Sequence, residues 1–547
     1  MKPRLMSAAL IAAALFIPAA LFTPAVQACT NFVASPGATV DGSTIVTYTC
    51  DGEFHPHLSR IPAANHEPGA MQEIKHWNGE VMGEIPYPEH TWAVVNLMNE
   101  HQVTVAETTT GGRDELINPD GLLHYWHLMR LALQRSTTAR ECVEVMGQLV
   151  TEHGYRSSGE SYCIGDPDEA WIMEMVGPGP DDDGAHWVAL RVPDGHISAF
   201  ANLGRIGTFD RDDKHCLASE GMEDFAAANG WYDPADGPFN WREAFHPATA
   251  QKKRYTATRV WSLYRRTAPS HEFPSDYHRG LADADPYPLF IKPDQKLAVG
   301  DVFKLMRDHY EGTDYDMTKG MDAGPYGYPV RYRPMGFEVD GDQYTWERPI
   351  STQQTGFSMV TQSREWLPDH VGGVTWYGLD DTDFTCYTPL YCGIDALPPA
   401  YTTGSLGQFS WDSAWWTFNF VSNYSGLRYQ DMIVDVRAVQ DAVESEYLAL
   451  QPAVELAAAS LAKDDPALMT RYLTDYSVHH AEDLVRKWRA LGESLLTRYN
   501  DGYVKDENGR AQESGYPEAW LRTVIKNRPE QFRLPEDGAS VEEPEDY

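Results

Sequence analysis

The first thirty residues constrain this chain more than any other feature. Two basic residues precede an apolar run over 6–22, and the segment ends in Val26-Gln27-Ala28, the small-residue pattern that signal peptidase reads. Two prolines interrupt the apolar run, and no basic stop flank follows it, whereas a membrane-spanning helix needs ~20 apolar residues. We therefore expect a signal peptide over 1–28, cleavage after Ala28, and an extracytoplasmic (periplasmic or secreted) protein.

A β-strand pattern begins directly behind the expected cleavage site. Residues 30–34 are rich in strand formers, turn residues follow, and 44–49 form a second strand pattern. The mature chain would thus begin with Cys29 at the start of its first strand. A thiol and a free α-amine would then belong to one residue.

This pairing is a plausible catalytic device. An α-amine titrates near ~7.7–8.0 and a free thiol near ~8.5, so a useful fraction of the amine is unprotonated at neutral pH. The amine can take the thiol proton directly or through one water. Removal of residues 1–28 would therefore create the general base for the nucleophile.

Two other interpretations of Cys29 stay open. The segment Val26-Gln27-Ala28-Cys29 also resembles a lipoprotein box, in which the thiol is alkylated and the amine is often acylated. Gln27 fits that box poorly, and a strand pattern follows where a lipoprotein usually has a flexible tether. Cys29 could also be an incidental residue.

Composition excludes several classes of function. The net charge is −36, from 80 acidic and 44 basic residues, which argues against binding to nucleic acid or to anionic membranes. No later segment is apolar enough to span a membrane. Six cysteines remain besides Cys29, an even number for an oxidising compartment, and Cys386 and Cys392 are close enough in sequence to pair.

The order of elements predicts an α+β fold. A hairpin pattern over 92–106 is followed by two helices, and strand patterns return between 161 and 201. The second helix, 139–150, has Ser136 or Thr137 as its expected N-cap. We expect a catalytic domain over 29–412 with inserted loops around 230–350. A helical region over 413–547 would follow, with an acidic tail from 536.

Several composite motifs then occur in a fixed order along the chain. They are Cys29-Thr30-Asn31, Asp41-Gly42-Ser43-Thr44, Asp51, Asn99-Glu100-His101, Glu107-Thr108, Gly111-Gly112-Arg113-Asp114-Glu115-Leu116, Ser157-Ser158-Gly159-Glu160-Ser161, Asp168-Glu169-Ala170-Trp171-Ile172-Met173-Glu174, Ala201-Asn202-Leu203-Gly204-Arg205-Ile206, Trp366-Leu367-Pro368, Gly372-Gly373-Val374 and Tyr499-Asn500-Asp501-Gly502-Tyr503. This set resembles the cysteine dipeptidases of the N-terminal-nucleophile (Ntn) hydrolases, the dipeptidase A and secernin relatives. The resemblance covers essentially the whole mature chain.

The resemblance implies a four-layer αββα core and hydrolysis of dipeptides through an acyl-enzyme. Cys29 matches the nucleophile, and Asp51 matches an acid that orients the terminal amine and thiol. Asn202 matches an asparagine that stabilises the oxyanion, and Arg259 matches an arginine that supports the nucleophile region. A backbone N–H near Thr109 would be the second oxyanion donor. The expected substrates are small peptides, and no cofactor is implied.

One position departs from the pattern of the related penicillin V acylases and bile-salt hydrolases. Three residues before the acid, those enzymes carry an arginine near the thiol, whereas this chain has Tyr48. A phenol cannot supply that positive charge. Arg113, Arg205 or Arg259 would have to supply it, or the thiolate would be less stabilised.

Two alternatives to a dipeptidase follow. The chain could be an amide acylase that acts on N-acyl substrates, or a lipid-anchored relative without catalysis, which the departure at Tyr48 would favour. A metal site is not expected, because the histidine pairs His55/His57 and His479/His480 have no third ligand at zinc spacing, and no H-E-x-x-H motif is present.

Overall fold

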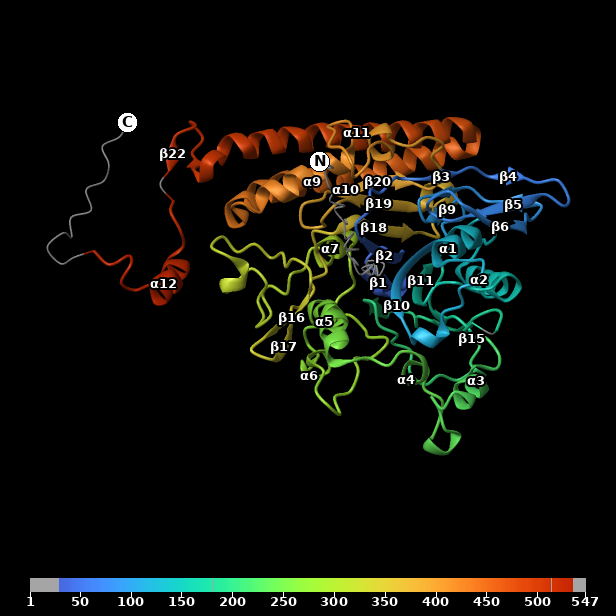
Figure 1. Ribbon diagram of the computed structural model, residues 1–547. Helices are drawn as coiled ribbons and strands as arrows, with labels where there is room; N and C mark the ends of the chain where they lie inside the picture. The colour runs from blue at the N-terminus through green and yellow to red at the C-terminus, as the bar shows by residue number, and fades with distance from the viewer. Residues whose placement is uncertain (1–28, 181, 513, 535–547) are drawn as a thin grey trace, which may run out of the picture.

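The computed structural model describes residues 29–180, 182–512 and 514–534. The expected signal peptide over 1–28 and the tail from 536 lie outside the described residues. Two antiparallel sheets form the centre of the molecule, with helices on both sides of them (Figure 1). Within the described ranges, no helix is both long and apolar enough to cross a bilayer.

The first sheet has six strands in the order β14-β1-β2-β18-β19-β20. The strands are β1 (Asn31–Ala34), β2 (Thr44–Asp51), β14 (Ile197–Phe200), β18 (Thr355–Ser363), β19 (Val374–Leu379) and β20 (Thr388–Tyr391). Every residue of β1 and β2 is buried. Both strands are therefore covered on both faces, which suits their runs of β-branched residues.

The second sheet has eight strands in the order β15-β13-β12-β11-β10-β9-β8-β3. The strands are β3 (Arg60–Ile61), β8 (Val94–Val95), β9 (Met98–Asn99), β10 (Thr104–Gly111), β11 (Gly159–Gly165), β12 (Ala170–Val176), β13 (His186–Arg191) and β15 (Cys216–Ala218). Its strands β10 and β11 contact β1 and β2 of the first sheet. The two sheets thus face each other through the strands that carry the N-terminal motifs.

Four small ribbons complete the β structure. They are β4 (Ala64–Asn65) with β7 (His90–Thr91), β5 (Met71–Lys75) with β6 (Val81–Pro86), β16 (Gly336–Val339) with β17 (Asp342–Thr345), and β21 (Val504–Lys505) with β22 (Ala511–Gln512).

Helices contact the two sheets from different parts of the chain. The second sheet is contacted by α1 (Tyr125–Leu133) and α2 (Ala139–His153). The first sheet is contacted by α5 (Ala250–Thr267), α7 (Val299–Leu305), α9 (Ala414–Ser425), α10 (Tyr429–Asp464) and α11 (Pro466–Arg498). The shorter helices are α3 (Met222–Ala228), α4 (Trp241–Phe245), α6 (Asp276–Arg279), α8 (Asp369–Gly372) and α12 (Glu518–Asn527). The predicted α+β class and the helical C-terminal region are confirmed.

The predicted hairpin over 92–106 is wrong in detail. Residues 92–97 do not form one strand, because β8 ends at Val95 and pairs with β9, which in turn pairs with β10. Asn96 has a φ of 54°. This left-handed conformation, which asparagine tolerates better than most residues, turns the chain inside the segment that was expected to be extended.

The predicted N-cap of α2 is also wrong, by one or two residues. The cap is Thr138, whose hydroxyl accepts a hydrogen bond from the backbone N–H of Glu141 at 3.1 Å. Thr137 instead donates through its hydroxyl to the Glu141 carboxylate at 2.8 Å. The run Ser136-Thr137-Thr138 offers three capping residues, and the sequence pattern does not distinguish them.

The cysteines form no disulfide in the structure. All seven lie in the described part of the chain and are buried free thiols. Cys386 and Cys392, which are close enough in sequence to pair, are separated by β20. The Cys392 thiol instead donates to the carbonyl oxygen of Asp369 at 3.1 Å.

Candidate active site

Cys29 lies at the entrance to β1, between the two sheets, and is fully buried. The next residue, Thr30, is already bonded across the sheet, because its N–H donates to the carbonyl of Thr49 and its own carbonyl accepts from the Thr49 N–H. The backbone of Cys29 is thus anchored to the strand that ends at Asp51. The thiol is fixed at the sheet interface and does not lie on a mobile loop.

Arg259 on α5 connects Cys29 to Asn202. Its Nη1 donates to the Cys29 carbonyl oxygen at 2.7 Å and to Thr30 Oγ1 at 2.8 Å. Its Nη2 donates to Asn202 Oδ1 at 3.0 Å. Burial and the nearby Arg348 lower the pKa of Arg259 to about 9. At neutral pH the guanidinium is charged and bridges the backbone of Cys29 to the side-chain amide of Asn202.

Asn202 follows β14 and has a φ of 64°, a left-handed conformation. Such backbone conformations are costly for residues other than glycine and often occur at functional sites. Its Nδ2 donates to the carbonyl oxygen of Thr109 at 2.8 Å. An amide NH₂ group has two N–H donors, so this bond orients the group and uses one of them.

Asp51, the last residue of β2, is fully buried and accepts several hydrogen bonds. Thr355 Oγ1 donates to it at 2.6 Å and Thr49 Oγ1 at 3.2 Å. Arg348 Nη2 forms a short ion pair with its Oδ2, and Arg348 Nη1 reaches Asn202 Oδ1 at 3.4 Å. Asp51 is therefore coupled to Asn202 through Arg348, a residue that the sequence pattern does not reveal.

Tyr48 occupies the place where the related acylases have an arginine. Its hydroxyl forms a short hydrogen bond to Glu107 Oε1 on β10 and lies 3.3 Å from Cys50 Sγ. The Cys29 thiol lies 3.9 Å from Tyr48 Oη and 3.6 Å from Glu107 Oε1. A phenol and a carboxylate thus face the sulfur in this chain.

Of the three arginines considered as replacements, Arg113 and Arg205 are engaged elsewhere. Arg113 Nε donates to the carbonyl of Ala244 at 2.6 Å, and Arg205 Nη1 donates to Tyr264 Oη at 3.0 Å. Arg259 contacts Cys29, but through the carbonyl oxygen of that residue. The expectation that one of them supplies positive charge to the sulfur is therefore not met by these contacts.

The electrostatics of the site favour a neutral thiol. Burial raises the pKa of Cys29 well above its ordinary value, and Cys50 and Glu107 raise it further. The thiolate is the nucleophilic form, so reaction requires a base that removes the proton as the sulfur attacks.

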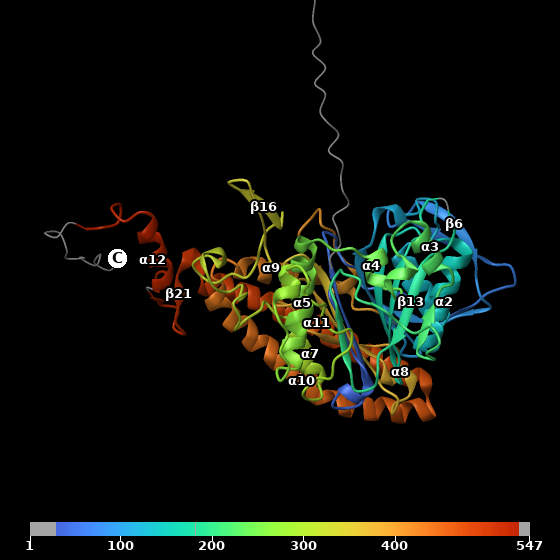
Figure 2. The ribbon, with the colours of Figure 1, turned by 90° about the horizontal axis from the view of Figure 1, so that it is seen from below.

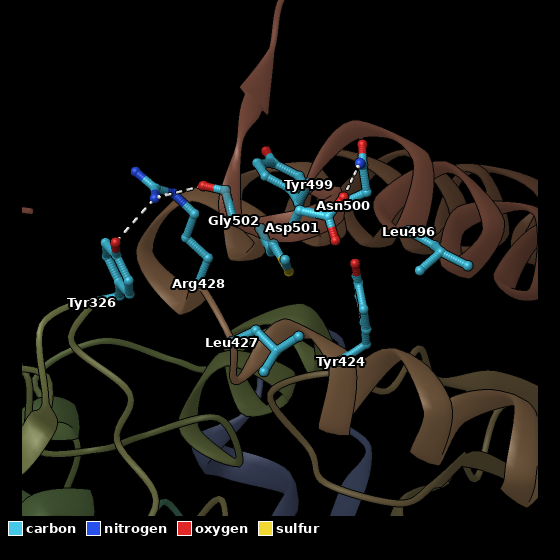
Figure 3. A pocket seen from close by; sticks show the side chains of 10 residues that line it. Tyr326, Tyr424, Leu427, Arg428, Leu496, Tyr499, Asn500, Asp501 and Gly502 are labelled. Atoms are coloured by element: carbon cyan, nitrogen blue, oxygen red, sulfur yellow. Dashed lines mark hydrogen bonds between the residues drawn. The ribbon is translucent and has the colours of Figure 1, made fainter. Parts of the chain in front are cut away.

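A cavity of about 540 Å³ lies away from this site, in the helical C-terminal region (Figure 3). Its walls come from α9, α10, α11 and η6 (Asn500–Gly502). Arg428 in its wall is already bonded, because its Nη1 donates to Tyr326 Oη at 3.1 Å and to the Gly502 carbonyl at 3.1 Å. The described residues around this cavity include no cysteine, serine or lysine.

The described ranges contain no group of three or more histidine, cysteine, aspartate or glutamate residues placed to bind a metal ion. His55 and His57 lie side by side, with ring centroids 4.9 Å apart, but His55 Nε2 bonds Ser413 and His57 Nε2 bonds the Gly404 carbonyl.

Cys29 is thus a buried cysteine between two sheets, linked through Arg259 to an asparagine amide and through Arg348 to a carboxylate. The model of peptidase family C69 matches residues 28–442. The chain therefore belongs to peptidase family C69, as the motif set predicts.

The chain is similar to curated relatives over 70–88% of its length. A probable dipeptidase of Latilactobacillus sakei is 24% identical over 515 residues, which cover 88% of this chain and 98% of the relative. A probable dipeptidase of Salmonella dublin is 26% identical and covers 70% of this chain and 85% of its own length. A dipeptidase of Bifidobacterium longum is 24% identical, with 72% and 76% covered.

Proposed function

We propose that this protein is an exported dipeptidase whose nucleophile is Cys29, exposed by removal of residues 1–28. The single observation that carries the proposal is the buried network at Cys29, in which Arg259 bonds the Cys29 carbonyl oxygen and Asn202, and Arg348 links Asn202 to Asp51. The family and the names of the relatives support peptide hydrolysis. The contacts of α1 and α2 with one sheet, and of α9 to α11 with the other, support a four-layer αββα core.

The first half of the reaction forms a tetrahedral intermediate, which becomes a thioester when the C–N bond breaks. The α-amine of the processed Cys29 removes the thiol proton while the sulfur attacks the scissile carbonyl carbon, which suits a thiol that burial keeps neutral. The carbonyl oxygen becomes an oxyanion, which Asn202 Nδ2 and a backbone N–H near Thr109 stabilise. One such donor is typically worth ~10²–10³ in rate.

The second half releases both products. When the C–N bond breaks, the α-ammonium of Cys29 returns its proton to the leaving amine, and Asp51 keeps the ammonium oriented through its network with Arg348. A water molecule, deprotonated by the same α-amine, then attacks the thioester carbon. The acid leaves, and the sulfur regains a proton. The cycle thus needs no group outside this chain.

The expected export supports this mechanism and fixes its timing. An uncleaved chain has an amide nitrogen at Cys29, and an amide cannot act as a base. The precursor would therefore be inactive until the leader is removed, whether by signal peptidase or by self-cleavage.

The proposal is tested with processed protein on a panel of dipeptides. We expect Cys29→Ser and Cys29→Ala to lose at least ~10³-fold in kcat/KM, because a hydroxyl is harder for the α-amine to deprotonate than a thiol, and a methyl group cannot attack the carbonyl carbon. Cys216→Ser is the matched control, since Cys216 lies on the edge strand β15, and it should keep wild-type activity.

Intact mass and N-terminal sequencing complete the test. The proposal requires an unmodified Cys29 as the first residue. A diacylated Cys29, an uncleaved leader in active protein, or full activity of Cys29→Ala would each overturn it. Turnover of N-acyl amides in preference to dipeptides would support the amide acylase instead.

A further inference from the structure

Two glutamates beside the nucleophile have no role in the proposed reaction. Glu107 lies on β10 and Glu160 on β11, and both are essentially inaccessible to solvent. In the register of these strands Glu160 pairs with Thr109, two residues from Glu107. Because paired residues share a face and alternate residues of a strand do so too, the two carboxylates lie on one face of the sheet. That face is the one toward Cys29.

The carboxylates are incompletely satisfied. Glu107 Oε1 receives the Tyr48 hydroxyl and faces the Cys29 thiol. Glu107 and Glu160 hydrogen bond each other through a carboxyl proton, and no other donor reaches Glu107 Oε2 or Glu160 Oε2. Across the described residues, no lysine, arginine or histidine forms an ion pair with either glutamate. Buried carboxylates are normally paired, and leaving them unpaired costs stability. The site therefore lacks a cationic donor.

We propose that Glu107 and Glu160 form the subsite that receives the free α-ammonium group of the substrate. This assignment rests on the proposed dipeptidase function. It identifies the residues by which the enzyme would recognise the free N-terminus of its substrate. A positively charged group with three N–H donors matches two adjacent carboxylates with open oxygens.

The distances agree with this assignment. In an amino acid the α-nitrogen and the carbonyl carbon are about 2.5 Å apart, from the standard bond lengths and angle. Attack begins with the sulfur ~3–3.5 Å from that carbon. The ammonium must then lie within about 6 Å of the sulfur, and Glu107 Oε1 is 3.6 Å from Cys29 Sγ.

The protonation of the pair supports the same ligand. Burial raises the pKa of both glutamates, and the charge of Glu107 raises that of Glu160 further. Two such carboxylates do not both ionise readily while the site is empty. An incoming ammonium favours the ionised pair, which an N-acyl group, being neutral, does not.

The α-ammonium of Cys29 itself is the competing occupant, and the experiment has to separate the two. We compare alanyl-alanine with propionyl-alanine, which has the same shape and lacks the ammonium. Wild-type enzyme should prefer alanyl-alanine by at least ~100-fold in kcat/KM. In Glu160→Gln, which does not touch the sulfur, this preference should fall below ~10-fold, mainly through a higher KM.

Three further measurements make the result decisive. Glu84→Gln, an exposed glutamate on β6, should retain the wild-type preference. The pH profile of Cys29 alkylation by iodoacetamide should be the same in wild type and Glu160→Gln. Binding of alanyl-alanine to Cys29→Ala should weaken at least ~10-fold in Cys29→Ala/Glu160→Gln, a readout that needs no turnover.

Each outcome has one meaning. If both Glu107→Gln and Glu160→Gln keep the wild-type preference for alanyl-alanine over propionyl-alanine, the proposed subsite is overturned. If Glu160→Gln shifts the pH profile of Cys29 alkylation but keeps the preference for alanyl-alanine, the two glutamates bind the α-amine of Cys29, and the proposed subsite is again overturned. If wild-type protein cleaves no dipeptide, yet Cys29→Ala binds alanyl-alanine in a Glu160-dependent way, the proposed function fails and the ammonium subsite stands.

Discussion

At the scale of single residues, the site is a chain of polar contacts that crosses from one sheet to the other. Arg259 joins the Cys29 backbone to Asn202, Arg348 joins Asn202 to Asp51, and Tyr48 joins the Cys29 thiol to Glu107. A buried network of this kind is rigid when it is satisfied and costly where it is not. Glu107 and Glu160, which have no cationic partner among the described residues, are the part of this network where we propose that the substrate ammonium binds.

The buried glutamates predict a pH dependence of stability. Their pKa values are raised in the folded state, so the protonated form is favoured by folding. The stability that the two glutamates contribute is therefore fully present below the ordinary carboxyl pKa. It is lost as the pH rises through their raised folded-state pKa values. The titratable groups that interact with them are Cys29, Tyr48, Asp51, Tyr125, Tyr155 and Tyr162.

The Glu160→Gln variant should lose less stability than wild type as the pH rises. We expect its advantage in free energy of unfolding over wild type to grow from pH 4 toward neutrality, with a limiting slope of about 1.4 kcal/mol per pH unit for one proton. Denaturant titrations at several pH values measure it, with Glu84→Gln as the control. Parallel pH profiles for wild type and Glu160→Gln would contradict the raised pKa.

At the scale of elements, the capping of α2 gives a direct comparison. Thr138→Ala removes the hydroxyl that accepts from the Glu141 N–H and should lower the free energy of unfolding by about 1 kcal/mol. Thr137→Ala removes a hydroxyl bonded at the surface and should cost at most about 0.5 kcal/mol. Dipeptide turnover should be unchanged in both variants. Equal losses in free energy of unfolding for the two variants would contradict the assignment of Thr138 as the N-cap.

Elements with strong periodicity are predictable from the sequence, and contacts between distant segments are not. The strands over 30–34 and 44–49 and the long C-terminal helices follow from local pattern, and they are found as β1, β2, α10 and α11. Arg348 and Thr355 lie about three hundred positions from Asp51, and no local pattern links them to it. Glu107 carries a weak signal, since a carboxylate inside a mostly buried strand is unusual.

At the scale of the whole molecule, α12 lies apart from the two sheets (Figure 2). No residue of this helix is buried. Deletion of 517–547 should therefore leave kcat/KM on dipeptides within about twofold of wild type and barely change the midpoint of thermal unfolding. Activity and melting curves of the truncated protein measure this. A loss of more than tenfold in activity would show that the segment contributes to the site.

The pairing of β2 with β18 has a consequence for when the enzyme becomes active during its synthesis and folding. The strand that ends at Asp51 pairs with Thr355–Ser363, so Cys29 of a nascent polypeptide is synthesised long before the strand that pairs with β2. Closing so large a loop is entropically slow, as expected for a topology of high contact order. Hydrolytic competence would then arise late and all at once, and amino-terminal fragments that stop short of β18 should be catalytically silent.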